Sequence, residues 1–185
     1  ISKTESNGYH TVVIEKGGKS TEEKPNATGG KDKTLILFSD NLDRAIATFV
    51  LANGAAATGH KVSIFFTFWG LNVIKKEHKP KVAKDFFGKM FSWMLPSSSK
   101  KLKLSKMSMM GIGNRLMRHI MRKKNINSLE EFRQQAIDNG VEFIACQMTM
   151  DMMGINKEEL IDGVSVGGVA TYMQRAENAG VNLFI

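Results

Sequence analysis

The sequence feature that most constrains the fold is a pair of short apolar runs separated by a helical pattern. Residues 34–38 (TLILF) are almost continuously apolar, which is typical of a parallel strand buried on both faces. Apolar side chains then recur at helical spacing from Leu42 to Ala57, and Gly59 ends the helix. A second apolar run, HKVSIFF, occupies residues 60–66. This order predicts a β-α-β unit with a right-handed crossover.

The same order of elements returns in the last third of the chain. Ser128 and Glu131 have the spacing of a capping box, and the helix that they begin ends at Asn139-Gly140. The strand pattern VEFIA follows at residues 141–145. Further predicted elements are a Met-rich helical segment that ends at Gly154, a short helix over 156–161, a strand over 163–166, a helix over 168–179 and a strand over 181–185. Strands that alternate with helices predict an α/β fold with a mostly parallel, doubly wound sheet.

Three regions of the chain differ in composition. Residues 1–16 hold a short strand pattern, YHTVVIE, which we expect to be the last strand of a preceding domain. Residues 17–33 are rich in Gly, Lys, Glu, Ser and Thr, which is linker composition. Residues 34–185 are predicted to form the α/β domain, with a basic, Met-rich insert at about 69–124. We therefore expect the chain to be a part of a longer fusion protein.

The net charge of the chain comes from one segment. The whole chain has a formal charge of +8. Between Lys75 and Lys124, 15 Lys and Arg residues face only Glu77 and Asp85, so this segment carries +13 and the remainder −5. A basic segment makes nucleic acid, an anionic membrane and an acidic protein the candidate partners, and it says nothing about the fold.

The insert contains two amphipathic helical patterns, near residues 86–94 and 108–124. Both fall short of the roughly 20 apolar residues that a membrane-spanning helix requires. A helical lid, an oligomer interface and a membrane-surface element are the alternatives that remain. Nucleic acid is the least expected partner, because no aromatic side chains alternate with the charges in the second half of the insert.

Cys146 is the candidate reactive residue. It is the only cysteine, which excludes an intramolecular disulfide and favours a reducing compartment such as the cytoplasm. It follows the strand VEFIA and precedes the helical pattern QMTMDMMG, so we expect it at the carboxyl edge of the sheet, where a helix N-terminus favours a nucleophilic thiolate. Asp151 would oppose that charge. The alternative is that Cys146 is a small buried hydrophobic residue.

Five further residues are predicted to line a pocket beside Cys146. Ser39 and Asp40 follow the first strand, so they belong to the same edge of the sheet. Gln147 is the next residue after the cysteine, and Gly167-Gly168 lies at a strand-to-helix turn where backbone N–H groups can face an anion. A glycine pair at such a turn is also typical of close backbone packing.

The sequence predicts no metal and no organic cofactor. The four histidines have no zinc-ligand spacing, and none of them is placed as a catalytic base for Cys146; they are His10, His60, His78 and His119. Gly111-Ile-Gly113 lacks a third glycine and a preceding strand, so it is not a dinucleotide site. The 12 methionines are interpreted as adaptable packing rather than as Cu(I) ligands.

Three segments together resemble the DsrE/DsrF-like family, in its larger, insert-bearing subgroup. The resemblance covers about Thr34 to Ile185. It rests on TLILFSDNLDRAIATFVLANGAAATGHKVSIFFTFWGLNVI, on EFIACQMTMDMMG and on the ending LIDGVSVGGVATYMQRAENAGVNLFI. The resemblance implies a flavodoxin-like fold, assembly into oligomers and a role as a sulfur carrier. It also implies that Cys146 accepts a sulfane sulfur as a persulfide and passes it to another thiol.

Partners are implied by the same resemblance. The YHTVVIE strand is similar to the end of a TusA-like domain, and rhodanese-like and TusA-like proteins are the expected sulfur donors and acceptors. Such a relay requires an exposed, reactive thiol on Cys146. The rival hypothesis is a non-catalytic adaptor that holds relay or disulfide-reductase partners at the membrane surface through the basic insert.

Overall fold

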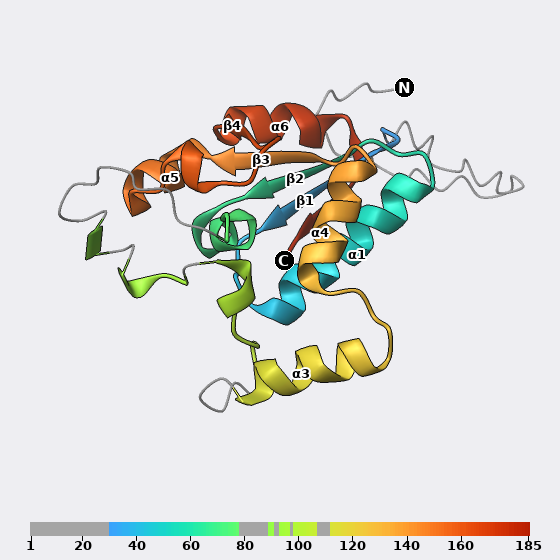
Figure 1. Ribbon diagram of the computed structural model, residues 1–185. Coiled ribbons are helices and arrows are strands. Elements are labelled where there is room, and N and C mark those ends of the chain that lie inside the picture. Colours follow the sequence, from blue (N-terminus) through green and yellow to red (C-terminus); the bar gives the residue numbers. More distant parts are fainter. Residues whose placement is uncertain (1–29, 78–88, 91–92, 97, 107–111) are drawn as a thin grey trace, which may run out of the picture.

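A parallel sheet of five strands organises the part of the chain that the computed structural model describes, which is residues 30–185 without 78–88, 91–92, 97 and 107–111 (Figure 1). The strand order is β4-β3-β2-β1-β5, and each neighbouring pair is parallel. The strands are β1 (Asp32–Leu37), β2 (Val62–Phe66), β3 (Glu142–Cys146), β4 (Ser165–Gly167) and β5 (Ala179–Phe184). The predicted α/β fold with a doubly wound parallel sheet is thereby confirmed.

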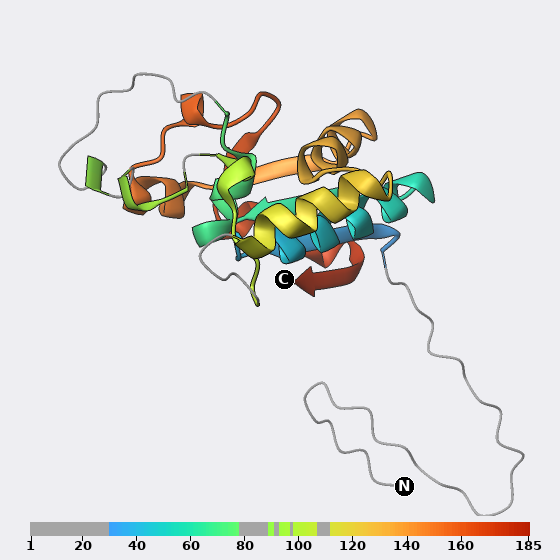
Figure 2. The same cartoon turned by 60° about the horizontal axis from the view of Figure 1, so that its bottom comes forward.

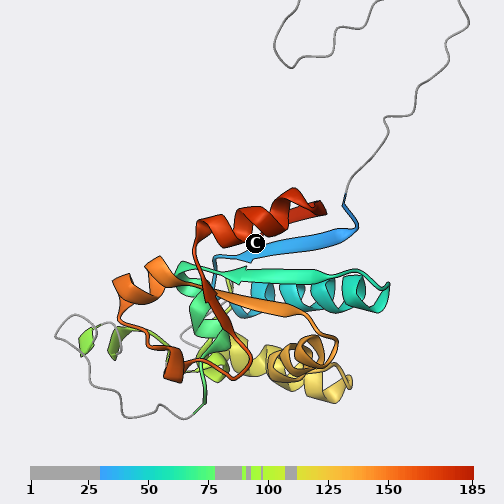
Figure 3. The ribbon, with the colours of Figure 1, turned by 90° about the horizontal axis from the view of Figure 1, so that it is seen from above.

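The helices of the described residues are α1 (Leu42–Ala57), α3 (Ile112–Lys123), α4 (Leu129–Asp138), α5 (Gln147–Met153) and α6 (Val169–Glu177), with short 3-10 helices at η1 (Phe68–Ile74), η2 (Ser99–Lys101) and η4 (Lys157–Glu159). Helices α1 and α4 cover one face of the sheet and α6 covers the other, and further helices lie outside these layers (Figure 3). In Figure 1, α5 lies beyond the tip of β3, at the carboxyl edge of the sheet, and η1 follows the end of β2.

The two faces of the sheet are packed very differently. Successive side chains of a strand point to opposite faces, so Ile64 and Phe66 of β2 enter the large core with α1, while Phe65 between them points to α6. The large core also holds Phe49 of α1 and Phe143 of β3. The α6 face has only a small buried cluster, and no residue of α6 is fully buried. One face therefore supplies most of the buried apolar area.

The predicted capping box begins α4. The Glu131 backbone N–H donates to Ser128 Oγ at 3.2 Å, and the Ser128 backbone N–H donates to Glu131 Oε2 at 2.6 Å. Hydrogen bonds from the Ser128 backbone and side chain to the Glu131 carboxylate hold the pKa of Glu131 below its ordinary value. Gly140, which follows the helix, has φ of +74°, a conformation that residues with a Cβ rarely adopt. The sequence signals at both ends of this helix are confirmed.

Part of the predicted insert belongs to the core of the domain. Leu71, Val73 and Ile74 of η1 are fully buried, as is Leu102 after η2. Gly70 has no room for a side chain, because a Cβ there would overlap the carbonyl of Leu37. The basic segment is thus joined to the domain through apolar contacts of its own.

Other predictions for the basic segment and the N-terminal region have different outcomes. The helix predicted over 108–124 corresponds to α3, and most of the helix predicted over 86–94 lies outside the described residues. The strand YHTVVIE and the linker also lie outside them. Among the residues that the structure does describe, no helix has the length and apolar character to cross a bilayer.

Replacing Ser128 by Ala should destabilise the domain by about 1 kcal/mol, because the Glu131 backbone N–H at the start of α4 loses its side-chain acceptor. The midpoint of urea unfolding, followed by circular dichroism, measures the change. Ser128→Asp is the matched control, since it keeps an oxygen acceptor at the cap and should retain most of the stability. Equal destabilisation by both substitutions would contradict the capping role.

Candidate functional site

Cys146 is the last residue of β3 and immediately precedes α5. In the sheet it pairs with Gly167 of β4, and it lies at the carboxyl edge as predicted (Figure 1). Alternation along β3 sends Phe143 and Ala145 into the large core and Ile144 and Cys146 to the α6 face. The candidate nucleophile therefore lies under the thinner of the two helical layers.

The thiol of Cys146 is buried rather than exposed. The residue is 1% exposed, and it packs with Phe65 and Ile144 beside the partly buried Ile36 and Tyr172. The expectation of an exposed thiol is wrong for this conformation of the single chain. The physical reason is the direction of the side chain, which α6 covers. A run of apolar residues that is buried on both faces does not reveal that direction in advance.

Helix α6 covers Cys146 with few buried side chains, and an ion pair near the C-terminal end of the helix ties it to the sheet. Tyr172 of α6 lies over Phe65, with ring centroids 5.4 Å apart, and its hydroxyl is 3.4 Å from Thr34 Oγ1. At the other end of the strands, Arg175 donates two hydrogen bonds of 2.9 Å to the carboxylate of Glu142. The hydrogen bonds and charge of Arg175 hold the pKa of Glu142 below its ordinary value. Few apolar contacts therefore oppose a displacement of the start of α6.

The predicted pocket residues share an edge of the sheet, but Ser39 and Asp40 lie apart from Cys146. Ser39 is buried and its Oγ accepts from the Asn41 N–H at 3.1 Å. Asp40 accepts from Asn72 Nδ2 at 3.0 Å, and Gln147 is exposed and donates to Asp151 at 2.7 Å. Ser39 and Asp40 follow β1, which is separated from β3 by β2.

The glycine pair is divided between two roles. A Cβ on Gly167 would come within 3.1 Å of Ile144 Cγ2 and of Thr171, so Gly167 permits close packing of α6 on the sheet. Gly168 has open space around its Cα and precedes the first residue of α6. The close contacts at Gly167 therefore support the alternative that this glycine pair serves close backbone packing.

A polar cluster at the same edge was missed by sequence reasoning. Thr67 Oγ1 and Thr149 Oγ1 are hydrogen-bonded at 3.0 Å, and the N–H of Phe68 donates to Thr149 at 3.3 Å. Phe68 has φ of +47°, which is strained backbone for an aromatic residue. The position of Thr67 directly after the second predicted strand was the available signal. The cluster fixes α5 against the end of β2, and so fixes the backbone next to Cys146.

Two methionines of α5 are exposed beside the cysteine. Met148 is 57% exposed and Met152 is 50% exposed, whereas Met150 and Met153 are buried in the large core. The interpretation of the methionines as packing residues thus holds for one side of α5. On the other side of α5, the exposed Met148 and Met152 form an apolar, polarisable surface. Among the described residues, no group of three His, Cys, Asp or Glu side chains is arranged to hold a metal ion.

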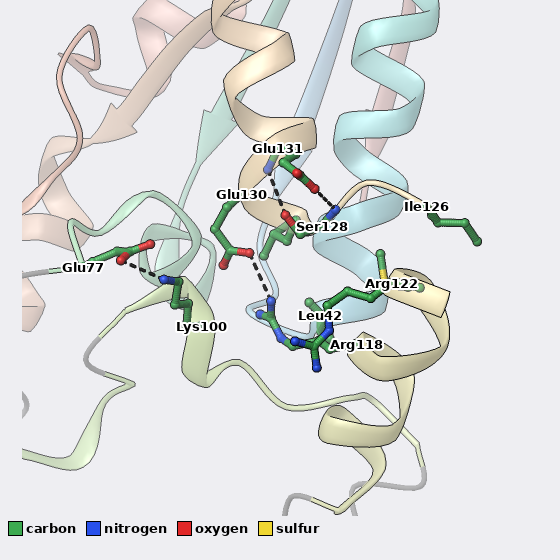
Figure 4. Close-up of a pocket in the computed structure, with 11 residues that line it drawn as sticks. Leu42, Glu77, Lys100, Arg118, Arg122, Ile126, Ser128, Glu130 and Glu131 are labelled. Atoms are coloured by element: carbon green, nitrogen blue, oxygen red, sulfur yellow. Dashed lines mark hydrogen bonds and ion pairs between the residues drawn. The ribbon is translucent and has the colours of Figure 1, made fainter. Parts of the chain in front are cut away.

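A cavity of about 450 Å³ lies away from Cys146, where α3 meets the start of α4 (Figure 4). Arg118 Nη1 donates to Glu130 Oε2 at 3.1 Å, and Ser99 Oγ donates to Glu130 Oε1 at 2.8 Å. Burial raises the pKa of Glu130, but the hydrogen bonds and charge of these partners outweigh it and hold the pKa below its ordinary value. This ion pair, which sequence reasoning also missed, joins α3 to the domain.

Comparisons with known proteins agree on one family. The model of the DsrE/DsrF/DrsH-like family matches residues 30–184. The uncharacterized protein YrkE of Bacillus subtilis is 44% identical over 155 residues, which are 84% of this chain and 97% of that protein. The sulfur carrier protein DsrE2 of Allochromatium vinosum is 35% identical over 159 residues, which are 84% of this chain and 98% of that protein.

Two solved structures align with most of this chain at low sequence identity. The ychN protein from E. coli covers 83% of this chain and 99% of its own length, at 12% identity and a TM-score of 0.48. A protein of unknown function from Methanobacterium thermoautotrophicum, MTH1491, covers 82% of this chain and 99% of its own, at 14% identity and a TM-score of 0.48.

The burial of Cys146 predicts slow thiol chemistry in the folded protein. A bulky aromatic disulfide reagent should react with native Cys146 at least about a hundredfold more slowly than with the urea-unfolded chain, because α6 must first open. Tyr172→Ala, which removes the ring over Phe65, should raise the native rate roughly tenfold. Gln174→Ala changes an exposed side chain of the same helix and should leave the rate unchanged. Equal native and unfolded rates would contradict the buried position.

Proposed function

We propose that this chain, which belongs to the DsrE/DsrF/DrsH-like family, is a sulfur-relay protein that carries a sulfane sulfur atom on Cys146. The family match and a 35% identical relative named as a sulfur carrier support a sulfur-relay role. The observation that carries the specific mechanism is the position of the only cysteine, at the carboxyl edge of a parallel sheet.

The proposed transfer needs one thiol and no external oxidant. The Cys146 thiolate attacks the outer sulfur of a donor persulfide, the S–S bond of the donor breaks, and the donor leaves as a thiolate. The new S–S bond belongs to a Cys146 persulfide. An acceptor thiolate then attacks the outer sulfur of this persulfide, which transfers one sulfur atom and regenerates the Cys146 thiolate. Each step exchanges one S–S bond for another, so the electrons balance.

Access to Sγ requires a local movement of the α6 layer. The cover has no fully buried residue of its own, it follows a strand of only three residues, and Gly168 precedes its first turn. Segments with few buried apolar contacts open at a lower free energy than the core of a domain. We propose that displacement of the first turn of α6, including Tyr172, exposes Cys146 to the donor and to the acceptor.

The proposed partners are proteins that present a persulfide or a thiol, of the rhodanese-like and TusA-like kinds. Met148 and Met152 are exposed apolar residues of α5, the helix that begins directly after Cys146. Thioether side chains adapt to different apolar surfaces, which suits a carrier that must meet a donor and an acceptor in turn. These two side chains are our candidate for partner contact.

A second copy of the chain is also a proposed partner. Strand β5 lies at one end of the strand order and exposes Val181, Leu183 and Phe184, while α6 next to it exposes Val169 and Met173. Exposed apolar side chains that lie on adjacent elements are typical of an interface between protein chains. We propose that this surface, β5 with α6, forms the contact of a homo-oligomer.

The burial of Cys146 gives weight to the rival function, a non-catalytic adaptor. An adaptor would hold relay or disulfide-reductase partners without carrying sulfur itself. The two functions differ in one result, because an adaptor would keep its effect on partner activity after Cys146→Ser, whereas a carrier would lose it.

Incubation with glutathione persulfide should add one sulfur atom to the wild-type protein, as measured by intact mass under non-reducing conditions. Cys146→Ser should add none. Tyr172→Ala should acquire the sulfur faster, because its thiol is less covered. If neither the wild-type protein nor Tyr172→Ala gained a sulfur atom, the carrier mechanism would be overturned and the adaptor would be left.

Phe184→Glu should shift the protein towards the monomer in light scattering after gel filtration, because it places a charge in the proposed β5 contact. Val50→Glu is the matched control, since Val50 is an exposed apolar residue on α1, outside the proposed contact surface. A wild-type protein that is monomeric at the highest concentration tested would overturn the oligomer.

A further inference from the structure

Helix α3 has its polar and apolar sides reversed relative to an ordinary surface helix. Asn114 and Arg118 face the domain, where Asn114 Nδ2 donates to the Leu102 carbonyl at 2.8 Å and Arg118 Nη2 donates to the Ser99 carbonyl at 3.1 Å. Met121 is the only buried residue of the helix. Polar hydrogen bonds rather than an apolar core therefore hold α3 in place.

The apolar side chains of α3 point away from the domain. Ile112, Leu116 and Ile120 are spaced four residues apart, so they form a single stripe along the helix. Leu116 is 52% exposed, and Met117 beside the stripe is also exposed. We call Ile112, Leu116, Met117 and Ile120 the α3 stripe. Figures 1 and 2 show α3 at the periphery of the molecule, outside the layers formed by the sheet, α1 and α4.

Cationic side chains border the stripe on the same helix. Arg115, Arg122 and Lys123 are exposed on α3, and Lys124 follows it. The sequence from Phe86 to Leu129 contains ten Lys and Arg residues and no Asp or Glu. An exposed apolar stripe bordered by cations is the arrangement of helices that lie in the plane of an anionic membrane surface.

We propose that α3 docks the domain on an anionic lipid surface, with the α3 stripe entering the interfacial region and the flanking cations meeting the lipid headgroups. A second copy of the chain fits this face less well, because self-association would bring two cationic surfaces together. Nucleic acid would use the cations but not the stripe, since phosphate contacts gain nothing from aliphatic side chains. The lipid surface uses both features at once.

The position of the docking helix leaves the relay site accessible. In Figure 1, α3 and α5 lie at different ends of the molecule, so contact of α3 with a membrane would not cover Cys146 or the exposed methionines of α5. The proposal is independent of the sulfur chemistry. A docked domain would deliver or receive sulfur at the membrane surface whether or not its own thiol is the carrier.

Co-sedimentation with vesicles tests the proposal directly. Vesicles of phosphatidylcholine with one third phosphatidylglycerol should bind the wild-type protein at low salt, and vesicles of phosphatidylcholine alone should bind it much more weakly. The double variant Leu116→Gln/Ile120→Gln should bind at least about tenfold more weakly, because the stripe loses its apolar contact. Arg115→Gln/Lys123→Gln should lose roughly tenfold or more at low salt and less at high salt.

Matched controls separate docking from misfolding and from other partners. Val50→Gln/Leu51→Gln alters exposed apolar residues on α1 and should bind as the wild type does, with circular dichroism unchanged in all variants. The proposal is overturned if anionic vesicles fail to bind the wild-type protein at low salt, or if the stripe variant binds as well as the wild type. Binding of duplex DNA with loss only in the charge variant, without vesicle binding, would assign the surface to nucleic acid instead.

Discussion

The unequal packing of the two faces of the sheet is the constraint on which the rest of the structure depends. Side chains alternate along each strand, and those that point to α1 and α4 form a large core with Phe49, Phe66 and Phe143. Those that point to α6 form a small cluster that includes Cys146. The large face holds most of the buried apolar area, and segments with few buried apolar contacts, such as α6, open at a lower free energy than the core. The candidate nucleophile lies under α6.

Local signals were sufficient for most of the fold. The apolar runs, the Ser128 to Glu131 capping box and Gly140 each act over a few residues, so they mark strands and helix ends without knowledge of the tertiary structure. The burial of Cys146 was not accessible in the same way. The strand VEFIA is apolar at almost every position, so it carries no alternation that would tell which face each side chain meets.

The polar contacts beside Cys146 and those that hold α3 join residues that are far apart in sequence. Thr67 meets Thr149 because β2 and β3 are neighbours, and Arg118 meets Glu130 because α3 folds back towards the start of α4. The amphipathic character of α3 could be predicted from its sequence. Which side of the helix faces the domain could not. A helix that is held through Asn114 and Arg118 violates the usual rule that the apolar stripe faces the core, and such violations are expected where a surface has a partner.

A covered thiol is consistent with carriage of a reactive sulfur. A persulfide is exposed to attack by any thiolate in a reducing compartment, so a permanently exposed carrier would lose its sulfur to abundant small thiols. If the closed form protects the sulfur and a partner binds the open form, transfer occurs only in the complex, and the partner's differential affinity for the open form supplies the free energy of opening. Exposed Met148 and Met152, next to the covered Cys146, offer the partner a contact that exists before the thiol is uncovered. Protection and selectivity would then have one physical source, which is the small number of apolar contacts that α6 makes with the sheet.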